Sequence, residues 1–188
     1  MFGYRGRIIY IDMADHSFRI EEFDETFAKA YLGGNGFAAK ILYDTLKPGI
    51  DPFDPSNTVV FAVGPVTDTA IPSTSRGYVA SKSPLNGLYF DSTFGGRFPI
   101  TQKRTGFEAI VITGKSTAPV YLYVDEERAE IQPASDLWGK NTKEAVEILY
   151  TRYGNDADVA AIGPAGENLV RFACIGHFWR GRSGTSGR

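Results

Sequence analysis

The chain has 188 residues but only one cysteine and two histidines. A single cysteine excludes an intrachain disulfide, and a four-cysteine iron–sulfur cluster cannot be held by this chain alone. The two histidines, His16 and His177, are too few for a protein-ligated zinc site of the usual kind. Neither kind of metal centre is therefore expected from this chain by itself.

Long apolar runs and a strong net charge are also missing. No run of eighteen apolar residues occurs, so no membrane span is expected, and the segment Met1–Arg7 lacks the apolar core of a signal peptide. The net charge of -2 argues against general nucleic-acid binding, which usually needs a basic domain or stripe. Together with the single cysteine, these absences predict a cytoplasmic protein that binds neither membrane nor nucleic acid.

The chain does contain enough apolar material for a folded core. Apolar residues make up 43% and aromatic residues 13%, and the length fits one domain or two small halves that share a core. Alternating and β-branched segments, helix caps and Gly-Pro turns predict the succession of elements. In chain order we expect a hairpin over 7–22, helices over 25–31 and 35–45, a buried strand over 58–63, strands over 76–81 and 88–93, a short helix over 98–104, a strand over 109–113, a hairpin over 120–132, a short helix over 134–138, a helix from Asn141 to Gly154, a buried strand over 158–162 and a strand over 168–175.

One order of elements occurs twice. A hairpin, helices, a buried strand, Gly-Pro and a segment of Ser, Thr, Gly and Arg follow one another, with Val63-Gly64-Pro65 and Ile162-Gly163-Pro164 at matching points. We therefore predict an α+β fold from a duplicated unit, with halves over approximately 1–105 and 106–188, that forms two β-sheets with pseudo-twofold symmetry. Such patterns also recur by chance, so the repeat alone does not decide between a duplication and a coincidence.

Two segments have the composition of phosphate-binding loops. Arg171–Arg188 begins as a strand and becomes a loop of Gly, Ser, Thr and Arg, and Pro72–Gly77 has the same composition. Exposed backbone N–H groups, small hydroxyls and fixed positive charge can cradle a phosphate. Because ordered chain ends are usually held by packing, a chain that stops on such a loop is expected to be the front piece of a longer protein.

Arginines beside Gly and Ser are the candidate ligand-binding residues, namely Arg76, Arg97, Arg180 and Arg182. They could bind a phosphate or the edge of a heterocycle, or they could serve only solubility, as most surface charges do. Cys174 is expected to be a buried, inert thiol, and nothing in the sequence fixes His177 beside it. From the residues alone, the chain is a binding frame with weak grounds for catalysis.

Several strings of residues, in order and over nearly the whole chain, resemble a known family. They look like the N-terminal domain of tungsten-containing aldehyde ferredoxin oxidoreductases. The strings are Tyr4-Arg-Gly-Arg7, Tyr31-Leu-Gly-Gly-Asn-Gly-Phe-Ala-Ala39, Val63-Gly-Pro-Val-Thr67, Ser81-Lys-Ser-Pro-Leu85, Gly95-Gly96, Ile112-Thr-Gly-Lys115, Leu137-Trp-Gly-Lys140 and Ala161-Ile-Gly-Pro-Ala-Gly-Glu-Asn-Leu-Val-Arg-Phe-Ala173.

The resemblance implies a cofactor and partners. In that family the N-terminal domain is a duplicated α+β unit that forms a base for two pyranopterin-dithiolene molecules, whose four sulfurs hold tungsten or, in some members, molybdenum. A magnesium ion bridges the pterin phosphates. Later helical domains, absent from this chain, supply the cysteines of a four-iron four-sulfur cluster and the acid/base residues, and the whole enzyme passes electrons to ferredoxin. Dimers occur in the family, so a homodimer is one assembly the resemblance allows.

The resemblance also assigns cofactor-binding positions one at a time. The family's arginine after the first Ser/Gly loop falls on Arg76, where it implies a phosphate contact. The family's Asn-Ser-Gly-Gly corresponds to Thr93-Phe94-Gly95-Gly96, so Thr93 replaces an asparagine near the magnesium. In the tail, Arg182 and Gly187 align with the family pattern and Ser183 replaces an alanine.

Two hypotheses result. In the first, the chain is the pterin-binding base of an enzyme that oxidises aldehydes to carboxylic acids, and it is inactive as an isolated fragment, with no catalytic residue of its own. In the second, it is a free-standing, non-catalytic module for pterin binding or subunit assembly. A lone domain with a large exposed apolar patch would favour the first, because missing domains would cover that patch.

Overall fold

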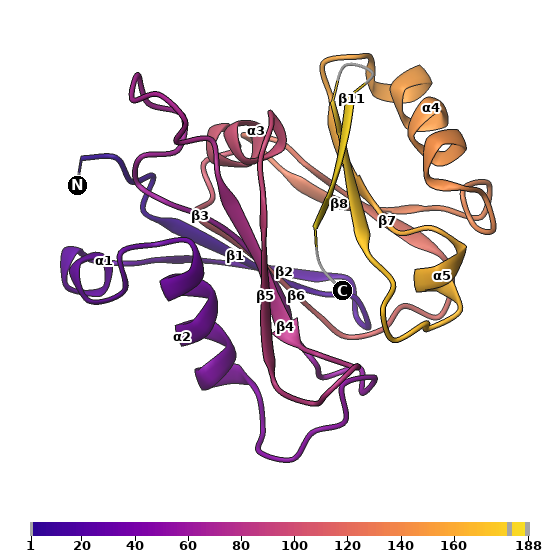
Figure 1. The fold of residues 1–188 in the computed structure, drawn as a ribbon, viewed down its shortest axis with the longest axis horizontal. Helices are drawn as coiled ribbons and strands as arrows, with labels where there is room; N and C mark the ends of the chain where they lie inside the picture. Colours follow the sequence, from indigo (N-terminus) through magenta and orange to yellow (C-terminus); the bar gives the residue numbers. More distant parts are fainter. Residues whose placement is uncertain (1, 180–181, 187–188) are drawn as a thin grey trace.

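The structure, a computed structural model, describes residues 2–179 and 182–186, and eleven strands and five helices lie in these residues (Figure 1). The strands are β1 (Arg7–Asp12), β2 (Ser17–Glu22), β3 (Val59–Val63), β4 (Gly77–Lys82), β5 (Tyr89–Phe94), β6 (Ala109–Thr113), β7 (Val120–Val124), β8 (Ala129–Pro133), β9 (Asp158–Ala161), β10 (Ile175–Trp179) and β11 (Arg182–Ser186). The helices are α1 (Glu25–Tyr31), α2 (Asn35–Thr45), α3 (Phe98–Arg104), α4 (Thr142–Tyr153) and α5 (Pro164–Glu167).

A six-stranded sheet forms the larger part of the fold, in the order β2-β1-β6-β3-β4-β5. β1 and β6 are parallel, with Ile9 opposite Ile110, and every other neighbouring pair is antiparallel. β1, β3 and β6 read as nearly continuous apolar runs because both of their faces are covered.

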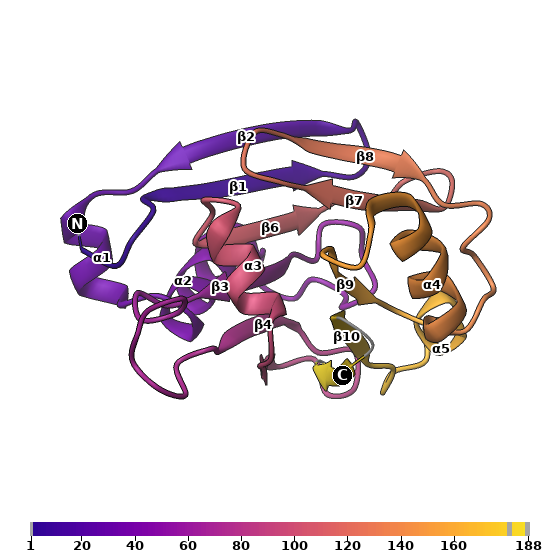
Figure 2. The same cartoon turned by 90° about the horizontal axis from the view of Figure 1, so that it is seen from above.

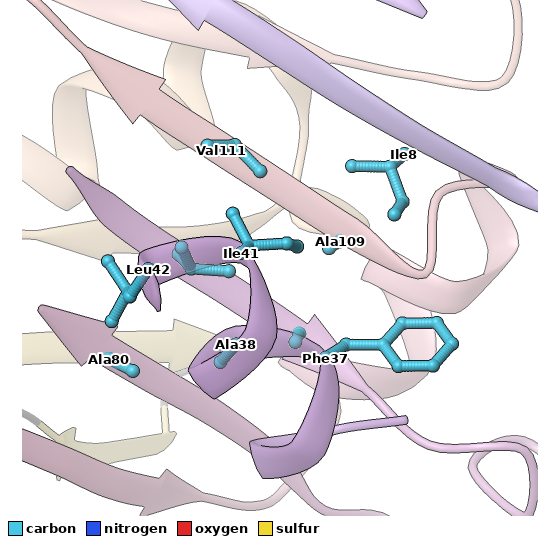
Figure 3. Close-up of a cluster of buried hydrophobic side chains, with 10 residues drawn as sticks. Ile8, Phe37, Ala38, Ile41, Leu42, Ala80, Ala109 and Val111 are labelled. Carbon is cyan, nitrogen blue, oxygen red and sulfur yellow. The ribbon is translucent and has the colours of Figure 1, made fainter. Parts of the chain in front are cut away.

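Different elements cover the two faces of this sheet. On one face, Phe37, Ala38, Ile41 and Leu42 of α2 pack on side chains of the central strands (Figure 3). On the other, Leu122 and Ile131 of the β7–β8 hairpin join a cluster around Ile9, Ile11 and Ile110. Figure 2 shows the hairpin running alongside β1 and β2, away from α2. The sheet is therefore the middle layer, and β11 of the C-terminal part of the chain contacts its edge strand β5.

A smaller sheet is built from the C-terminal part of the chain. β9, β10 and β11 form an antiparallel sheet in the order β11-β10-β9, and β7 and β8 form a separate two-stranded sheet. Ala145, Val146 and Leu149 of α4 pack with Val159 of β9 in a second core. α3 contacts β9 and β10, so it joins the smaller sheet to the larger one.

Most of the predicted elements are confirmed, several of them residue for residue. α1, α2, α3, β6 and β7 have the expected bounds. Asp24 caps α1 by accepting a hydrogen bond from the Phe27 N–H, and Asn141 and Glu144 form the capping box that begins α4. Pro99 lies in the first turn of α3, where a proline is tolerated because its missing N–H has no helical partner.

Other expectations are wrong. The segment 134–138 is a turn rather than a helix, and residues 168–174 are irregular, so the strand begins at Ile175. The expected turn after Gly163 is the short helix α5, and Arg182–Ser186 is a strand rather than a loop, because it pairs with β10. Cys174 is exposed, not buried.

The predicted symmetry has a mixed outcome. The α+β class is confirmed, but the described strands form three sheets instead of two. A hairpin, a helix and a three-stranded meander occur in both halves, yet the second hairpin stays separate from its meander. Duplication with pseudo-twofold symmetry therefore stays a prediction. Within the described residues, no helix has the length and apolar character needed to cross a membrane.

Candidate functional site

The predicted cofactor-binding residues of the first half lie together, where β4 begins and β5 ends. Arg76 directly precedes β4, Thr93 lies on β5, and Gly95 and Gly96 follow it. The antiparallel register places Tyr78 opposite Thr93 and Gly77 opposite Phe94, so the next step of the ladder brings Arg76 to Gly95. Four residues separated by up to twenty positions thus form one end of the sheet.

The Arg76 side chain lies closely over the backbone of Gly95. A Cβ added at Gly95 would lie 3.0 Å from Arg76 Nη1, which is tighter than almost all real Cβ contacts. The Ser75 hydroxyl donates a hydrogen bond to the Gly96 carbonyl and so joins the two segments a second time. A glycine at 95 therefore lets a guanidinium and a loop backbone approach one another.

The charge at this end of the sheet is uncompensated. The Arg76 side chain is exposed, and its guanidinium forms neither an ion pair nor a hydrogen bond with any residue the structure describes. Thr93 and Gly96 are exposed as well, and Gly95 is half-buried. The site presents five N–H donors of one guanidinium beside small residues, which is an arrangement suited to a phosphate or carboxylate.

The tail residues lie beside the same edge. β11 packs against β5, and it begins with Arg182 and Ser183, which pair with Trp179 and Phe178 of β10. The structure thus brings β11, which contains Arg182 and Ser183, next to β5, which contains Thr93. Gly187 lies outside the described residues, as does Arg180.

Arg97 is not a free ligand-binding arginine. Its Nε lies 3.1 Å from Asp158 Oδ2, and its Nη2 donates to the backbone carbonyl of Asp156. Its positive charge is therefore paired inside the protein. Sequence reasoning missed this role because Asp158 gave no signal beyond its place at the start of a predicted strand.

A buried ion pair stabilises another part of the larger sheet. The Lys103 ammonium donates to the Glu108 carboxylate, whose side chain is fully buried, and both oxygens of that carboxylate share a bifurcated hydrogen bond from the Arg5 N–H. Burial lowers the pKa of Lys103, and Glu108 opposes that effect. A small cavity borders Tyr4, Thr67 and Lys103, but none of the predicted cofactor residues lines it.

Metal-ligating side chains do not cluster in the part of the chain that the structure describes. Within residues 2–179 and 182–186, no group of three or more His, Cys, Asp or Glu side chains is placed to hold a metal ion. The exposed Arg76 guanidinium and the backbone beside it are suited to anion recognition.

Comparison with known proteins identifies relatives of this arrangement. A tungsten-containing aldehyde ferredoxin oxidoreductase of Pyrococcus horikoshii is 43% identical over 188 residues, covering 98% of this chain and 31% of that protein. An aliphatic sulfonate oxidoreductase, WOR-like subunit, of Pyrococcus furiosus is 28% identical and covers 93% of this chain and 30% of that protein. The chain thus spans about a third of the length of the curated relatives it matches.

A solved structure has the same fold. The active site complex BamBC of benzoyl coenzyme A reductase, determined with 1,5-dienoyl-CoA, superposes with a TM-score of 0.93 at 36% identity and covers 98% of this chain and 28% of that one. Residues 8–187 match the family described as aldehyde ferredoxin oxidoreductase, N-terminal domain. The chain belongs to the aldehyde ferredoxin oxidoreductase N-terminal domain family of oxidoreductases.

Proposed function

We propose that this chain is the pyranopterin-binding base of a tungsten- or molybdenum-containing oxidoreductase. The observation that carries the proposal is the exposed, unpaired guanidinium of Arg76 beside Thr93 and the Gly95–Gly96 loop, with β11 alongside. The residues fit a phosphate-bearing cofactor because a planar guanidinium binds phosphate oxygens in pairs. The names of the relatives, which specify tungsten, support the choice of cofactor.

Each residue has a stated part in holding the cofactor. Arg76 would bind a pterin phosphate, and Thr93 would offer an oxygen to a magnesium ion bound with the cofactor. Gly95 and Gly96 let the ligand approach the backbone, and Arg182, Ser183 and Gly187 form the corresponding subsite of the second half. The bound cofactor would supply two-electron redox chemistry at its metal, and this chain would bind and orient it.

The remainder of the reaction belongs to other domains. We propose that a longer protein oxidises an aldehyde to a carboxylic acid and passes electrons to ferredoxin through a four-iron four-sulfur cluster. Exposed apolar side chains in the segments before and after α5, namely Ile162, Leu169 and Phe172, support a face that further domains cover. By this proposal the isolated chain is inactive, because it lacks cluster ligands and part of the substrate pocket.

The test is to measure the cofactor bound to the chain. The protein is produced in a host that makes pyranopterin and is grown with tungstate, and pterin and tungsten are measured per purified chain. We expect bound pterin in the wild type and a loss of about tenfold or more in Arg76→Ala, because charged hydrogen bonds contribute roughly 1.5–3 kcal/mol. Arg128→Ala, another exposed arginine, is the control and should bind normally. A folded wild-type chain without pterin under these conditions would overturn the proposal.

A further inference from the structure

The Gly95–Gly96 loop is bracketed by two contacts to the smaller sheet. Phe94 precedes the glycines, and its ring centroid lies 6.0 Å from that of His177 on β10. Arg97 follows them, and its Nε lies 3.1 Å from Asp158 Oδ2 on β9. The loop that ends β5 is thus attached on both sides to the sheet that contains β11.

The polar contact is shielded from water. The Asp158 side chain is only 1% exposed, and its Oδ2 also accepts a hydrogen bond from Thr101 in the first turns of α3. Arg97 reaches past Asp158 to the backbone carbonyl of Asp156. A buried carboxylate must be paired and hydrogen-bonded to remain charged, so removal of Arg97 would leave a costly charge in this place.

The backbone of β11 lies directly against the His177 ring, at a position where no residue with a side chain would fit. His177 is buried, and the register of β10 and β11 places it opposite Gly184. A Cβ at Gly184 would lie 2.3 Å from His177 Cε1, so only glycine fits there. His177 therefore packs between Phe94 at the end of β5 and the backbone of β11.

The two contacts reach different parts of β11: His177 lies opposite Gly184 in the middle of the strand, and Asp158 lies in the row in which the strand begins. Asp158 pairs with Trp179, and Trp179 pairs with Arg182, so Arg97 is bonded to the same row of the small sheet in which β11 begins. A rigid connection thus runs from Gly96 through Arg97 and Asp158 to Arg182. These are the ends of the two predicted cofactor subsites.

We propose that Arg97, paired with Asp158, is a positioning residue that fixes the spacing between the Gly95–Gly96 loop and the start of β11. The ligand is a phosphate-bearing pyranopterin that contacts both segments, so this inference rests on the proposed function. Arg97 does not touch the ligand. It holds apart, at a fixed distance, the two groups of residues that do, and this pre-organisation avoids an ordering cost upon binding.

The first test needs no cofactor. Hydrogen–deuterium exchange is measured on the 188-residue chain for peptides that cover 89–97 and 175–186. We expect Arg97→Ala to raise exchange in both peptides by tenfold or more, and Arg97→Lys, which keeps the charge, to restore part of the protection. The control carries Lys103→Met and Glu108→Gln together and so removes the other buried ion pair. In this control, exchange in peptides 89–97 and 175–186 should not rise relative to exchange in the other peptides of the chain. Normal protection of 175–186 in Arg97→Ala would overturn the inference.

The second test follows the bound cofactor. The chain is produced with pterin as above, and the release of pterin is timed well below the unfolding temperature. We expect release from Arg97→Ala to be at least tenfold faster than from the wild type, with Arg97→Lys in between and the Lys103/Glu108 control unchanged. Equal release rates for the wild type and Arg97→Ala would also overturn it. A wild type that binds no pterin would overturn the proposed function and its ligand, while the exchange result still decides whether Arg97 couples the two segments.

Discussion

Glu108 is a residue whose charge the larger sheet cannot lose without cost. It neutralises the buried Lys103 ammonium, and its two oxygens accept a bifurcated hydrogen bond from the Arg5 N–H. Glu108→Gln keeps the shape and one acceptor but leaves the ammonium uncompensated. We expect the free energy of unfolding to fall by about 3–5 kcal/mol, measured by guanidinium denaturation.

A double variant tests whether the loss of stability comes from the unpaired charge or from disturbed packing. When Lys103→Met is added to Glu108→Gln, no unpaired charge remains, and most of the lost stability should return. Two independent, additive losses would instead show that the ion pair itself is not the cause, because residues in contact are expected to couple.

We expect His177 to make the stability of the domain depend on pH in the mildly acidic range. Burial lowers its pKa, and the nearby Asp158 charge opposes this with a smaller effect. The unfolded chain, with an ordinary histidine pKa of about 6.5, therefore takes up a proton more readily than the folded one. Stability should be constant above about pH 7 and fall as the pH decreases through 6.5, by up to about 1.4 kcal/mol per pH unit.

Two variants test this assignment by denaturation at pH 7.5 and 5.5. His177→Gln should flatten the dependence, because no group titrates at that position. His16→Gln, at the exposed turn between β1 and β2, should preserve it. An unchanged slope in His177→Gln would mean that other groups cause the acid sensitivity.

At the scale of elements, α4 depends on its first turn. The Asn141 side chain accepts a hydrogen bond from the Glu144 N–H at 3.0 Å, and the Glu144 carboxylate accepts one from the Asn141 N–H at 3.2 Å. Asn141→Ala should lower stability by about 1 kcal/mol, measured by thermal or chemical unfolding. Lys143→Ala changes a neighbouring exposed side chain and should have little effect. Equal losses in both variants would contradict a specific role of the cap.

Local signals explain which elements could be predicted. α1 and α4 begin at side-chain caps, and α2 follows a pair of glycines and has apolar residues at helical spacing, so the sequence indicates their bounds. β11 has none of these signals, because Arg182–Ser186 is a strand only through its pairing with β10. Its Gly, Ser and Thr residues are equally typical of a loop, which is why their composition predicts a loop.

At the scale of the whole molecule, only part of the candidate site could be predicted from the sequence. The resemblance indicated Arg76, Thr93 and Gly95, and the structure shows that they are neighbours across the β4–β5 ladder. Their part in cofactor binding stays a prediction. The connection through Arg97 and Asp158 joins residues some sixty positions apart, and no local pattern marks such a pair. Sequence reasoning therefore identified the ends of the site but not what holds them together.

The size of the native protein tests the proposed division of labour. The relatives are about three times as long as the part that this chain matches. If the chain is the base domain of a complete oxidoreductase, an antibody to it should detect a native polypeptide roughly three times 20.6 kDa. That polypeptide should reduce a viologen dye with an aldehyde as electron donor. The 188-residue chain should not, because its single cysteine cannot supply the four ligands of an iron–sulfur cluster. A native product near 20.6 kDa would instead favour a free-standing module, and aldehyde-dependent dye reduction by the short chain would contradict both hypotheses.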